Sequence, residues 1–207
     1  MILYGLGALD STTSMTPLGH SMLKYPLDPS RSRVLLSSIS RSCTLDILDI
    51  LSLSIESPIF LEPPSTTDRE EVALARSAFT HRDGDHMTML NVLRSYETLP
   101  RGDVKGRKGW CKERWVNEKA LKKAVLARDQ MRGICEKEGV DWRTTCGDDS
   151  EPVLRCLVDG LFTNTAILRD GEYKQTVGNS VSPASEFADL AFSVPSALTN
   201  VLSSVVG

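Results

Sequence analysis

Apolar side chains recur at helical spacing through most of this chain, and this pattern constrains its fold more than any other feature. The clearest segment is residues 117–138, where one stripe along a single helix face comprises Leu121, Ala124, Val125, Arg128, Met131 and Cys135. Gly139 follows it as a helix stop. The segment is therefore predicted to form a long helix, with Leu121, Val125 and Met131 in the core.

Other segments carry the same signal more weakly. Helices are predicted from Pro17, with Thr16 as N-cap, to before Pro26, over 31–40, from Thr44, from a capping box at Thr67 and Glu70 to Phe79, and from Asp85. Ser150 and Pro152 begin a last helix, whose residues Leu154, Leu157 and Leu161 are expected in the same core as Leu121. Two segments are not predicted to be helical: a loop containing Gly102, Gly106 and Gly109, and a β-hairpin over 166–176 turned at Asp170-Gly171.

Charge is unevenly distributed along the chain. Hydrophobic residues make up 41% and the net charge is −3, which excludes a wholly disordered, collagen-like or polytopic membrane protein. Residues 101–145 nevertheless hold 13 basic and 7 acidic residues, a net of +6. This segment is either a phosphate-binding surface or a solvated helix face. Trp110 and Trp115 within it either stack on bases or anchor the core, and we favour the core.

Local chemical motifs give few indications of catalysis. The phosphate loop G-x-x-x-x-G-K-[ST], a dinucleotide fingerprint and a nucleophile elbow are all missing from the sequence. Asp83, Asp85 and His86, with His81 nearby, suggest a metal site, but Asp85 as a helix cap is the favoured interpretation. Cys111 is expected to be an inert thiol, and the five cysteines indicate reduced intracellular thiols. Residues 190–207 carry no charge, and a poorly ordered tail is favoured over a membrane anchor.

Four blocks of sequence together resemble a known family. They are LGALD at 6–10 with LG at 18–19 and PLDP at 26–29, GDHMTMLNV at 84–92, WCKE at 110–113 with Asn117, Leu121 and R-x-Q-M at 128–131, and GLF-x-N-x-A at 160–166 with DG-x-Y at 170–173. Their order and spacing resemble the helicase-associated region of DEAH-box RNA helicases from about residue 3 to about residue 176. The resemblance covers most of the chain.

The resemblance implies a mainly α fold: a helical ratchet bundle, with a partial winged-helix wing before it and a hairpin of a truncated OB-fold after it. The implied domains are 1–25 for the end of the winged helix, 26–163 for the ratchet domain, 164–182 for the incomplete OB-fold and 183–207 for the tail. Thr13 stands where the family usually has glycine in the wing turn, so a looser turn is expected. After Thr176 the family pattern fails, and a fragment, an alternative product and a misassembled gene end all stay open as explanations.

The resemblance also implies a function. The chain is expected to be an accessory segment of an ATP-dependent RNA helicase that contacts single-stranded RNA and supports translocation. ATP and Mg²⁺ would be bound by RecA-like domains, so no cofactor and no catalytic residue is expected in this chain. The candidate RNA-binding residues are Lys105, Arg107, Lys108, Lys112, Arg114, Asn117, Lys119, Lys122 and Lys123. Lys119, Lys122 and Lys123 are expected to share one helix side, whereas loop lysines are free to point anywhere.

Two alternatives to this function stay open. The chain is otherwise a protein-interaction module that docks helicase activator proteins, or a non-functional truncated product. The expected partners are single-stranded RNA, the RecA-like domains of a full-length protein and possible activators, with no membrane. The expected location is intracellular, in the nucleus or nucleolus by family resemblance.

Overall fold

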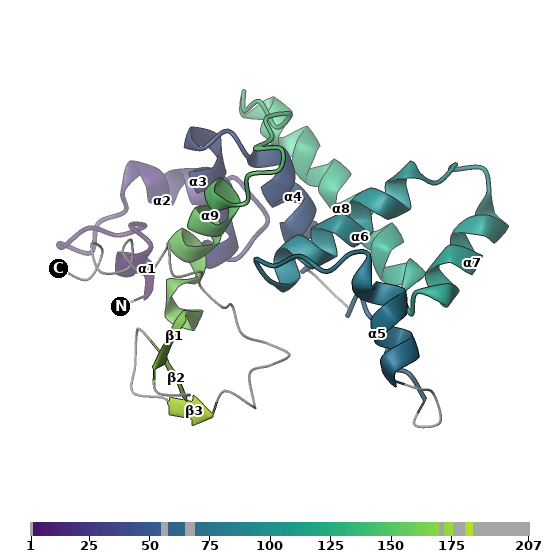
Figure 1. The fold of residues 1–207 in the computed structure, drawn as a ribbon. Coiled ribbons are helices and arrows are strands. Elements are labelled where there is room, and N and C mark those ends of the chain that lie inside the picture. Colours follow the sequence, from purple (N-terminus) through teal and green to yellow (C-terminus); the bar gives the residue numbers. More distant parts are fainter. Residues whose placement is uncertain (1, 55–57, 65–68, 170–171, 176–180, 184–207) are drawn as a thin grey trace. The chain divides into compact units, whose positions relative to one another are not determined.

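Helices make up most of the residues that the structure describes. This computed structural model describes residues 2–54, 58–64, 69–169, 172–175 and 181–183 (Figure 1). Its helices are α1 (Ile2–Gly5), α2 (Pro17–Met22), α3 (Pro29–Ser40), α4 (Thr44–Leu53), α5 (Arg69–Ser77), α6 (Asp85–Thr98), α7 (Val104–Glu113), α8 (Glu118–Lys137), α9 (Glu151–Leu161) and the 3-10 helix η1 (Phe162–Asn164). The strands are β1 (Ala166–Arg169), β2 (Glu172–Gln175) and β3 (Val181–Pro183). The mainly helical fold class is confirmed for these residues.

The chain divides into two compact units. The first comprises residues 1–47 and 134–207, and the second comprises residues 48–133. The divisions fall within α4 and α8. They differ from the domain limits that the resemblance implies, and those limits stay a prediction.

In the first unit, α3 packs closely on α9. Gly160 makes this approach possible, because a Cβ there would lie 2.3 Å from the carbonyl oxygen of Ser30 and 2.4 Å from Cγ2 of Val34. Val34 is completely buried. Near the N-terminus, a smaller cluster buries Leu6, Ala8 and Met22. The glycine is therefore required by close helix packing and not by backbone freedom.

The turn at residues 9–15 places a β-branched residue in an unfavourable conformation. Thr13 has φ 65°, in the left-handed region that favours glycine. Oδ1 of Asp10 accepts hydrogen bonds from the backbone N–H groups of Thr12 at 2.8 Å and Ser14 at 3.0 Å. The turn is thus closed by Asp10, and the expectation that Thr13 loosens it stays a prediction.

The second unit buries a large apolar cluster. Its buried members are Leu53, Ile59, Phe79, Val92, Leu93, Tyr96, Cys111, Val116, Ala120, Leu121 and Ala124. Val125 is half-buried against this cluster, and Met131 is also buried. The buried face predicted for the long helix is therefore confirmed.

The expectation of one shared core was wrong. Leu154 and Leu157 are buried, but they belong to the first unit, whereas Leu121 belongs to the second. Leu161 is only half-buried. Helical periodicity indicates which face of a helix is buried, but it does not indicate which elements cover that face.

Helix ends follow the predicted signals, with one correction. Gly139 has φ 70° after α8, and the N–H of Val140 donates to the carbonyl of Cys135 at 2.8 Å, as in a Schellman motif. The N-cap of α6 is Gly84, with φ 104°, and not Asp85. Asp85 is the first helical residue, where its carboxylate still complements the positive end of the helix dipole.

Residues 104–113 form helix α7, so the loop predicted around Gly106 and Gly109 was wrong. Asp103 is its N-cap, and its side chain accepts a hydrogen bond from the N–H of Gly106 at 2.8 Å. Cys111 is buried and Trp110 is partly buried in the core of the second unit. Capping and burial therefore outweigh the low helix propensity of the two glycines, each of which destabilises the helix by about 1 kcal/mol.

The described strands form an antiparallel sheet in the order β1-β2-β3. Arg169 of β1 lies opposite Glu172 of β2, where the sequence predicted a hairpin. The turn 170–171, the capping residue Thr67 and the tail 184–207 lie outside the described residues. This pairing does not by itself identify an OB-fold, which stays a prediction.

Candidate nucleic-acid interface

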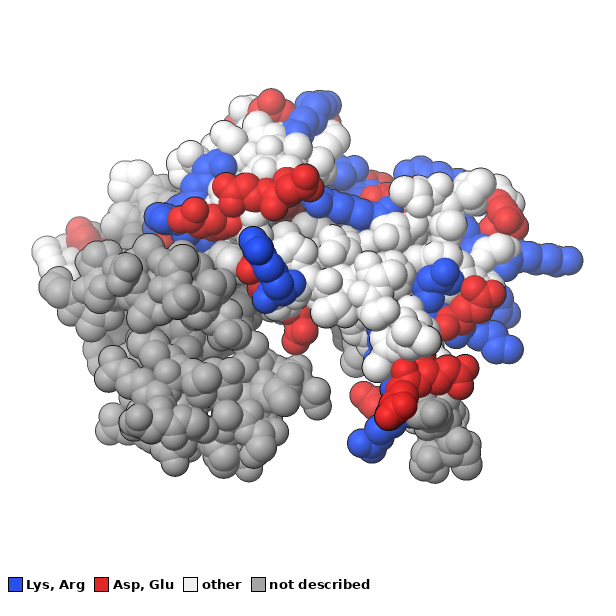
Figure 2. Space-filling view, in the orientation of Figure 1, with Lys and Arg blue, Asp and Glu red and all other residues white. Residues whose placement is uncertain are grey.

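Helix α7 carries three of the predicted lysines on one exposed side. Lys105, Lys108 and Lys112 are spaced i, i+3 and i+7, and all three are exposed. Within the described part of the chain, no carboxylate forms an ion pair with them. Figure 2 shows basic side chains projecting where α7 lies in Figure 1, with acidic side chains beside some of them. Because this segment is a helix and not a loop, the three lysines form a row about 10 Å long.

Helix α8 carries a second set of exposed lysines near its N-terminus. Lys119, Lys122 and Lys123 are all exposed and lie on the side opposite the buried Leu121. Lys122 forms an ion pair with Glu118 at 2.8 Å, and this hydrogen bond raises the pKa of Lys122. The three lysines therefore share one face of α8.

The predicted arginines of this segment are turned toward the protein. Nη2 of Arg107 donates to the carbonyl of Tyr96 at 3.2 Å, and its guanidinium lies 4.0 Å from the centroid of the Tyr96 ring. Nη1 of Arg114 donates to the carbonyl of Trp110 at 3.3 Å, and its guanidinium lies 5.0 Å from the Trp110 ring centroid. The contacts of Arg107 hold α7 to Tyr96 of α6, whereas those of Arg114 stay within α7 and its C-cap. Neither arginine belongs to the exposed lysine row.

Asn117 is engaged as the cap of α8. Its Oδ1 accepts a hydrogen bond from the N–H of Ala120 at 3.1 Å, and its Nδ2 donates to the carbonyl of Pro58 at 3.3 Å. Its own N–H donates to the carbonyl of Ile59 at 2.8 Å. The structure thus assigns the side chain of Asn117 a capping contact, while a phosphate contact stays an untested prediction.

The two tryptophans of this segment make different contacts. The Trp110 ring packs on Phe79 and Tyr96, with ring centroids 5.6 Å and 6.1 Å apart. Trp115 has φ 54°, and its carbonyl accepts hydrogen bonds from the N–H of Leu61 at 2.8 Å and Nη2 of Arg76 at 3.2 Å. The ring contacts support the interpretation of Trp110 as a core anchor. The contacts of Trp115 involve its backbone carbonyl, so the same interpretation of its side chain stays a prediction.

A buried ion network around Arg128 of α8 was not predicted from the sequence. Arg128 is 2% exposed, and its guanidinium donates to both carboxylate oxygens of Glu97 on α6, at 2.6 and 2.7 Å, and to Asp49 on α4 at 3.1 Å. Burial raises the pKa of Asp49 against the effect of Arg128, whereas the Arg128 hydrogen bond lowers the pKa of Glu97. The sequence placed Arg128 on the buried stripe, but no local signal indicates its partners.

The remaining motifs give no catalytic constellation. Oδ2 of Asp83 lies 3.6 Å from Nδ1 of His81, and burial lowers the pKa of His86 to about 4. Among the described residues, no group of three or more ligand-type side chains is placed to hold a metal ion. Burial raises the pKa of the Cys111 thiol to about 11, which confirms the inert thiol expected there.

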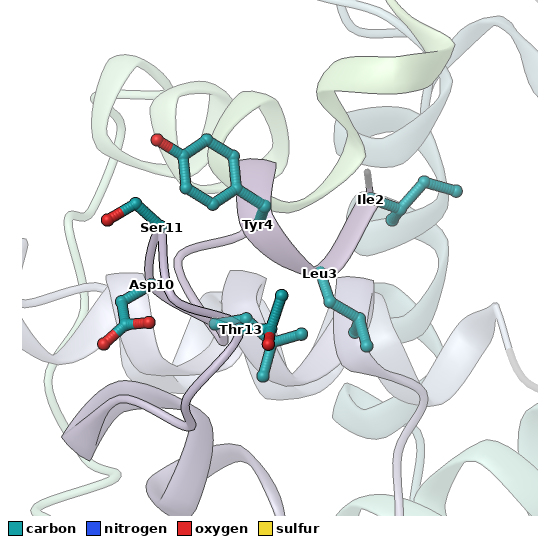
Figure 3. Close-up of a pocket in the computed structure, with 7 residues that line it drawn as sticks. Ile2, Leu3, Tyr4, Asp10, Ser11 and Thr13 are labelled. Carbon is teal, nitrogen blue, oxygen red and sulfur yellow. The ribbon is translucent and has the colours of Figure 1, made fainter.

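A hollow of about 620 Å³ lies in the first unit, between α1 and the turn that follows it (Figure 3). It is lined by Ile2, Leu3, Tyr4, Leu9, Asp10, Ser11 and Thr13. Its lining is largely apolar, and its one carboxylate, that of Asp10, closes the turn described above. The lining provides no nucleophile paired with a base.

Comparison with known proteins identifies the region from which this architecture derives. Residues 1–27 match the helicase associated domain (HA2), winged-helix, and residues 28–89 match the helicase associated domain (HA2), ratchet-like. The human ATP-dependent RNA helicase DHX33 is 40% identical over 175 residues, which cover 83% of this chain and 24% of the relative. This chain belongs to the helicase-associated region of DEAH-box RNA helicases.

Other relatives match the same helicase-associated region. The probable ATP-dependent RNA helicase DHX35 of Pongo abelii is 35% identical over 166 residues, covering 80% of this chain and 22% of the relative. The pre-mRNA-splicing factor ATP-dependent RNA helicase prp22 of Schizosaccharomyces pombe is 30% identical over 183 residues, which cover 86% of this chain and 15% of the relative. The chain thus spans less than a quarter of the length of these relatives. Among its described residues, no helix combines the length and hydropathy that a membrane span requires.

Proposed function

We propose that the helicase-associated region described here is an electropositive wall for single-stranded RNA in an ATP-dependent RNA helicase, and that it supports translocation. The observation that carries this proposal is the placement of six lysines on the exposed sides of two consecutive helices, α7 and α8. The arginines of the same segment are engaged with the protein. Exposed ammonium groups on flexible stems suit contacts with phosphates along a moving strand.

Recognition by these lysines is expected to be electrostatic. Ammonium groups that neutralise phosphates release counterions, so binding weakens steeply with salt and depends little on base sequence. The half-buried Trp110 packs against the core, so base stacking is not part of the proposal. A wall of this kind lets a strand slide, because no base-specific contact has to break at each step.

The chemistry of NTP hydrolysis is assigned to other domains. The sequence lacks the phosphate loop and the D-E-A-H motif, so the proposal gives this chain no part in NTP hydrolysis. The relatives are named ATP-dependent RNA helicases, which supports RecA-like domains as partners that bind ATP and Mg²⁺. The name of prp22 as a pre-mRNA-splicing factor supports a nuclear location as a further part of the proposal.

A second candidate function is the docking of an activator protein. Leu126 on α8 is 65% exposed, and α1 presents Ile2 and Tyr4 at 56% and 59% exposure beside the hollow of Figure 3. Exposed large apolar side chains of this kind are typical of protein contacts. This candidate predicts partner binding that does not depend on the six lysines.

Charge reversal at the lysines distinguishes the two functions. Fluorescence anisotropy of a labelled single-stranded oligouridine is measured with the wild-type chain, with K105E/K108E/K112E and with K119E/K122E/K123E. Both variants are expected to bind RNA more weakly at 0.1 M salt. The control R82E/K137E/R143E changes the net charge by the same amount at exposed positions elsewhere and is expected to retain most of the affinity. If all three variants lost RNA affinity equally, net charge alone would explain the effect. If both lysine variants bound RNA as the wild type does, protein docking would be favoured.

A further inference from the structure

Helix α7 contains two glycines for which the structure gives different explanations. Glycine inside a helix costs about 1 kcal/mol relative to alanine, so each glycine requires a reason. At Gly106, an added Cβ would lie 2.1 Å from Oδ2 of Asp103, the capping carboxylate. At Gly109, an added Cβ would meet no atom within 4 Å. Packing therefore accounts for Gly106 and leaves Gly109 without a structural reason.

Gly109 lies on the side of α7 that carries the lysines. Around the helix axis, Lys105 and Lys112 lie about 40° and 60° from Gly109 and Lys108 lies about 100° from it, all to the same side. Gly109 thus forms one edge of the lysine face, at a place where the helix has no side chain. A helix backbone accessible beside cations is open to close approach by an anionic chain.

We propose that Gly109 forms a notch that seats the sugar-phosphate backbone of single-stranded RNA against the helix, with Lys105, Lys108 and Lys112 holding its phosphates. This inference rests on the proposed function and assigns a specific contact to it. A Cβ at position 109 would project about 1.5 Å from the backbone and hold the strand away from the helix. The ammonium groups would then meet the phosphates at greater distance.

The end of the helix is not the site of this contact. The N-terminus of α7 is occupied by the carboxylate of Asp103, which accepts from the N–H of Gly106. An anion there would face a like charge. The side of the helix presents the three lysines and the bare backbone, and the exposed carboxylate of Glu113, four residues after Gly109, is paired with Arg114 at 3.1 Å. The ligand class is thus an extended polyanion that lies along the helix, and not a single phosphate bound at its end.

Alanine substitution separates binding from stability in the full 207-residue chain. Gly109→Ala is expected to raise the Tm by about 2–4 °C, because it removes a helix-interior glycine without a clash. It is also expected to weaken oligouridine binding about fivefold at 0.1 M salt, the effect of losing one single-strand phosphate contact. A substitution that stabilises the fold and weakens binding cannot act through misfolding.

Gly133→Ala is the matched control. Gly133 lies in α8, and a Cβ there also meets no atom within 4 Å. Its neighbours on the same helix face are Asp129, Gln130, Glu136 and Lys137, a single lysine rather than three. This variant is expected to gain stability and to bind RNA as the wild type does.

The proposed notch is overturned if Gly109→Ala binds RNA with wild-type affinity while K105E/K108E/K112E binds weakly. That outcome leaves the proposed function intact. If neither variant changes RNA binding, the proposed function fails at α7 as well. If Gly109→Ala weakens binding of polyglutamate as much as that of RNA, the notch is not a seat for a sugar-phosphate backbone and the inference is overturned.

Discussion

Removing the positive charge of Arg128 is predicted to destabilise the second unit strongly at neutral pH. In Arg128→Met, a side chain of similar length replaces the guanidinium, so the loss is mainly electrostatic. Asp49 is 4% exposed and would then be a buried carboxylate without its 3.1 Å partner. Removing one member of a buried ion pair typically costs about 3–5 kcal/mol. That is a large fraction of the roughly 5–15 kcal/mol that stabilises a folded protein.

The same variant is predicted to have a distinctive pH dependence. Burial already raises the pKa of Asp49, and loss of Arg128 raises it further. A carboxyl whose folded-state pKa is above its unfolded-state value stabilises the fold in its protonated form and loses this contribution as the pH rises through the folded-state pKa. The destabilisation caused by Arg128→Met is therefore expected to be smaller at pH 5 than at pH 8.

Urea denaturation followed by circular dichroism at pH 5 and pH 8 measures both effects. In Arg128→Met, Asp49 keeps a weaker ion pair with Arg132 at 3.8 Å. The double variant D49N/R128M keeps the shape of the site without this buried carboxylate and is expected to recover part of the lost free energy of unfolding. The electrostatic argument would be refuted if Arg128→Met cost less than about 1 kcal/mol at pH 8, below the range for breaking a buried pair. If Arg128→Met lowered the free energy of unfolding equally at pH 5 and pH 8, the loss would be due to packing.

Three further predictions follow from the fold. Leu121→Ala should reduce the free energy of unfolding by about 2–5 kcal/mol, because Leu121 is completely buried; a loss below about 0.5 kcal/mol, typical of surface changes, would contradict its place in the core. Thr13→Gly should stabilise the first unit by up to about 1 kcal/mol by removing left-handed strain, partly offset by the backbone entropy of glycine; a lower Tm would show that the turn needs the threonine side chain. The purified chain should show no NTPase activity with or without RNA, since it lacks the phosphate loop, and RNA-stimulated hydrolysis that survives stringent purification would disprove this.

The elements best predicted from the sequence are those with strong local signals. The stripe from Leu121 to Cys135 and the stop at Gly139 define α8 because periodicity and a left-handed C-terminal residue are both local properties. Helix α7 was missed because its two glycines are local signals against a helix, while the burial of Cys111 depends on residues distant in the chain. Local pattern and tertiary packing disagree there, and packing determines the structure.

The candidate site was predicted in composition but not in geometry. Clustered charge identifies the basic segment, yet nothing in the sequence distinguishes Arg107, stacked on Tyr96, from its exposed neighbour Lys108. The partners of Arg128 were beyond sequence reasoning because Asp49 and Glu97 lie 79 and 31 positions away. Direction and pairing of side chains follow from tertiary structure, whereas charge and helical spacing follow from the sequence.

The salt dependence of RNA binding tests the central claim most directly. Binding of oligouridine to the wild-type chain is measured between 50 mM and 400 mM salt, and the logarithm of the association constant is plotted against the logarithm of salt concentration. Six lysine contacts predict a slope of about −4, from roughly −0.7 per single-strand phosphate contact, and K105E/K108E/K112E is predicted to reduce its magnitude by about 2. A slope near zero, or the same slope in the wild type and in both lysine variants, would contradict the assignment of the RNA-contacting surface to the exposed lysines of α7 and α8.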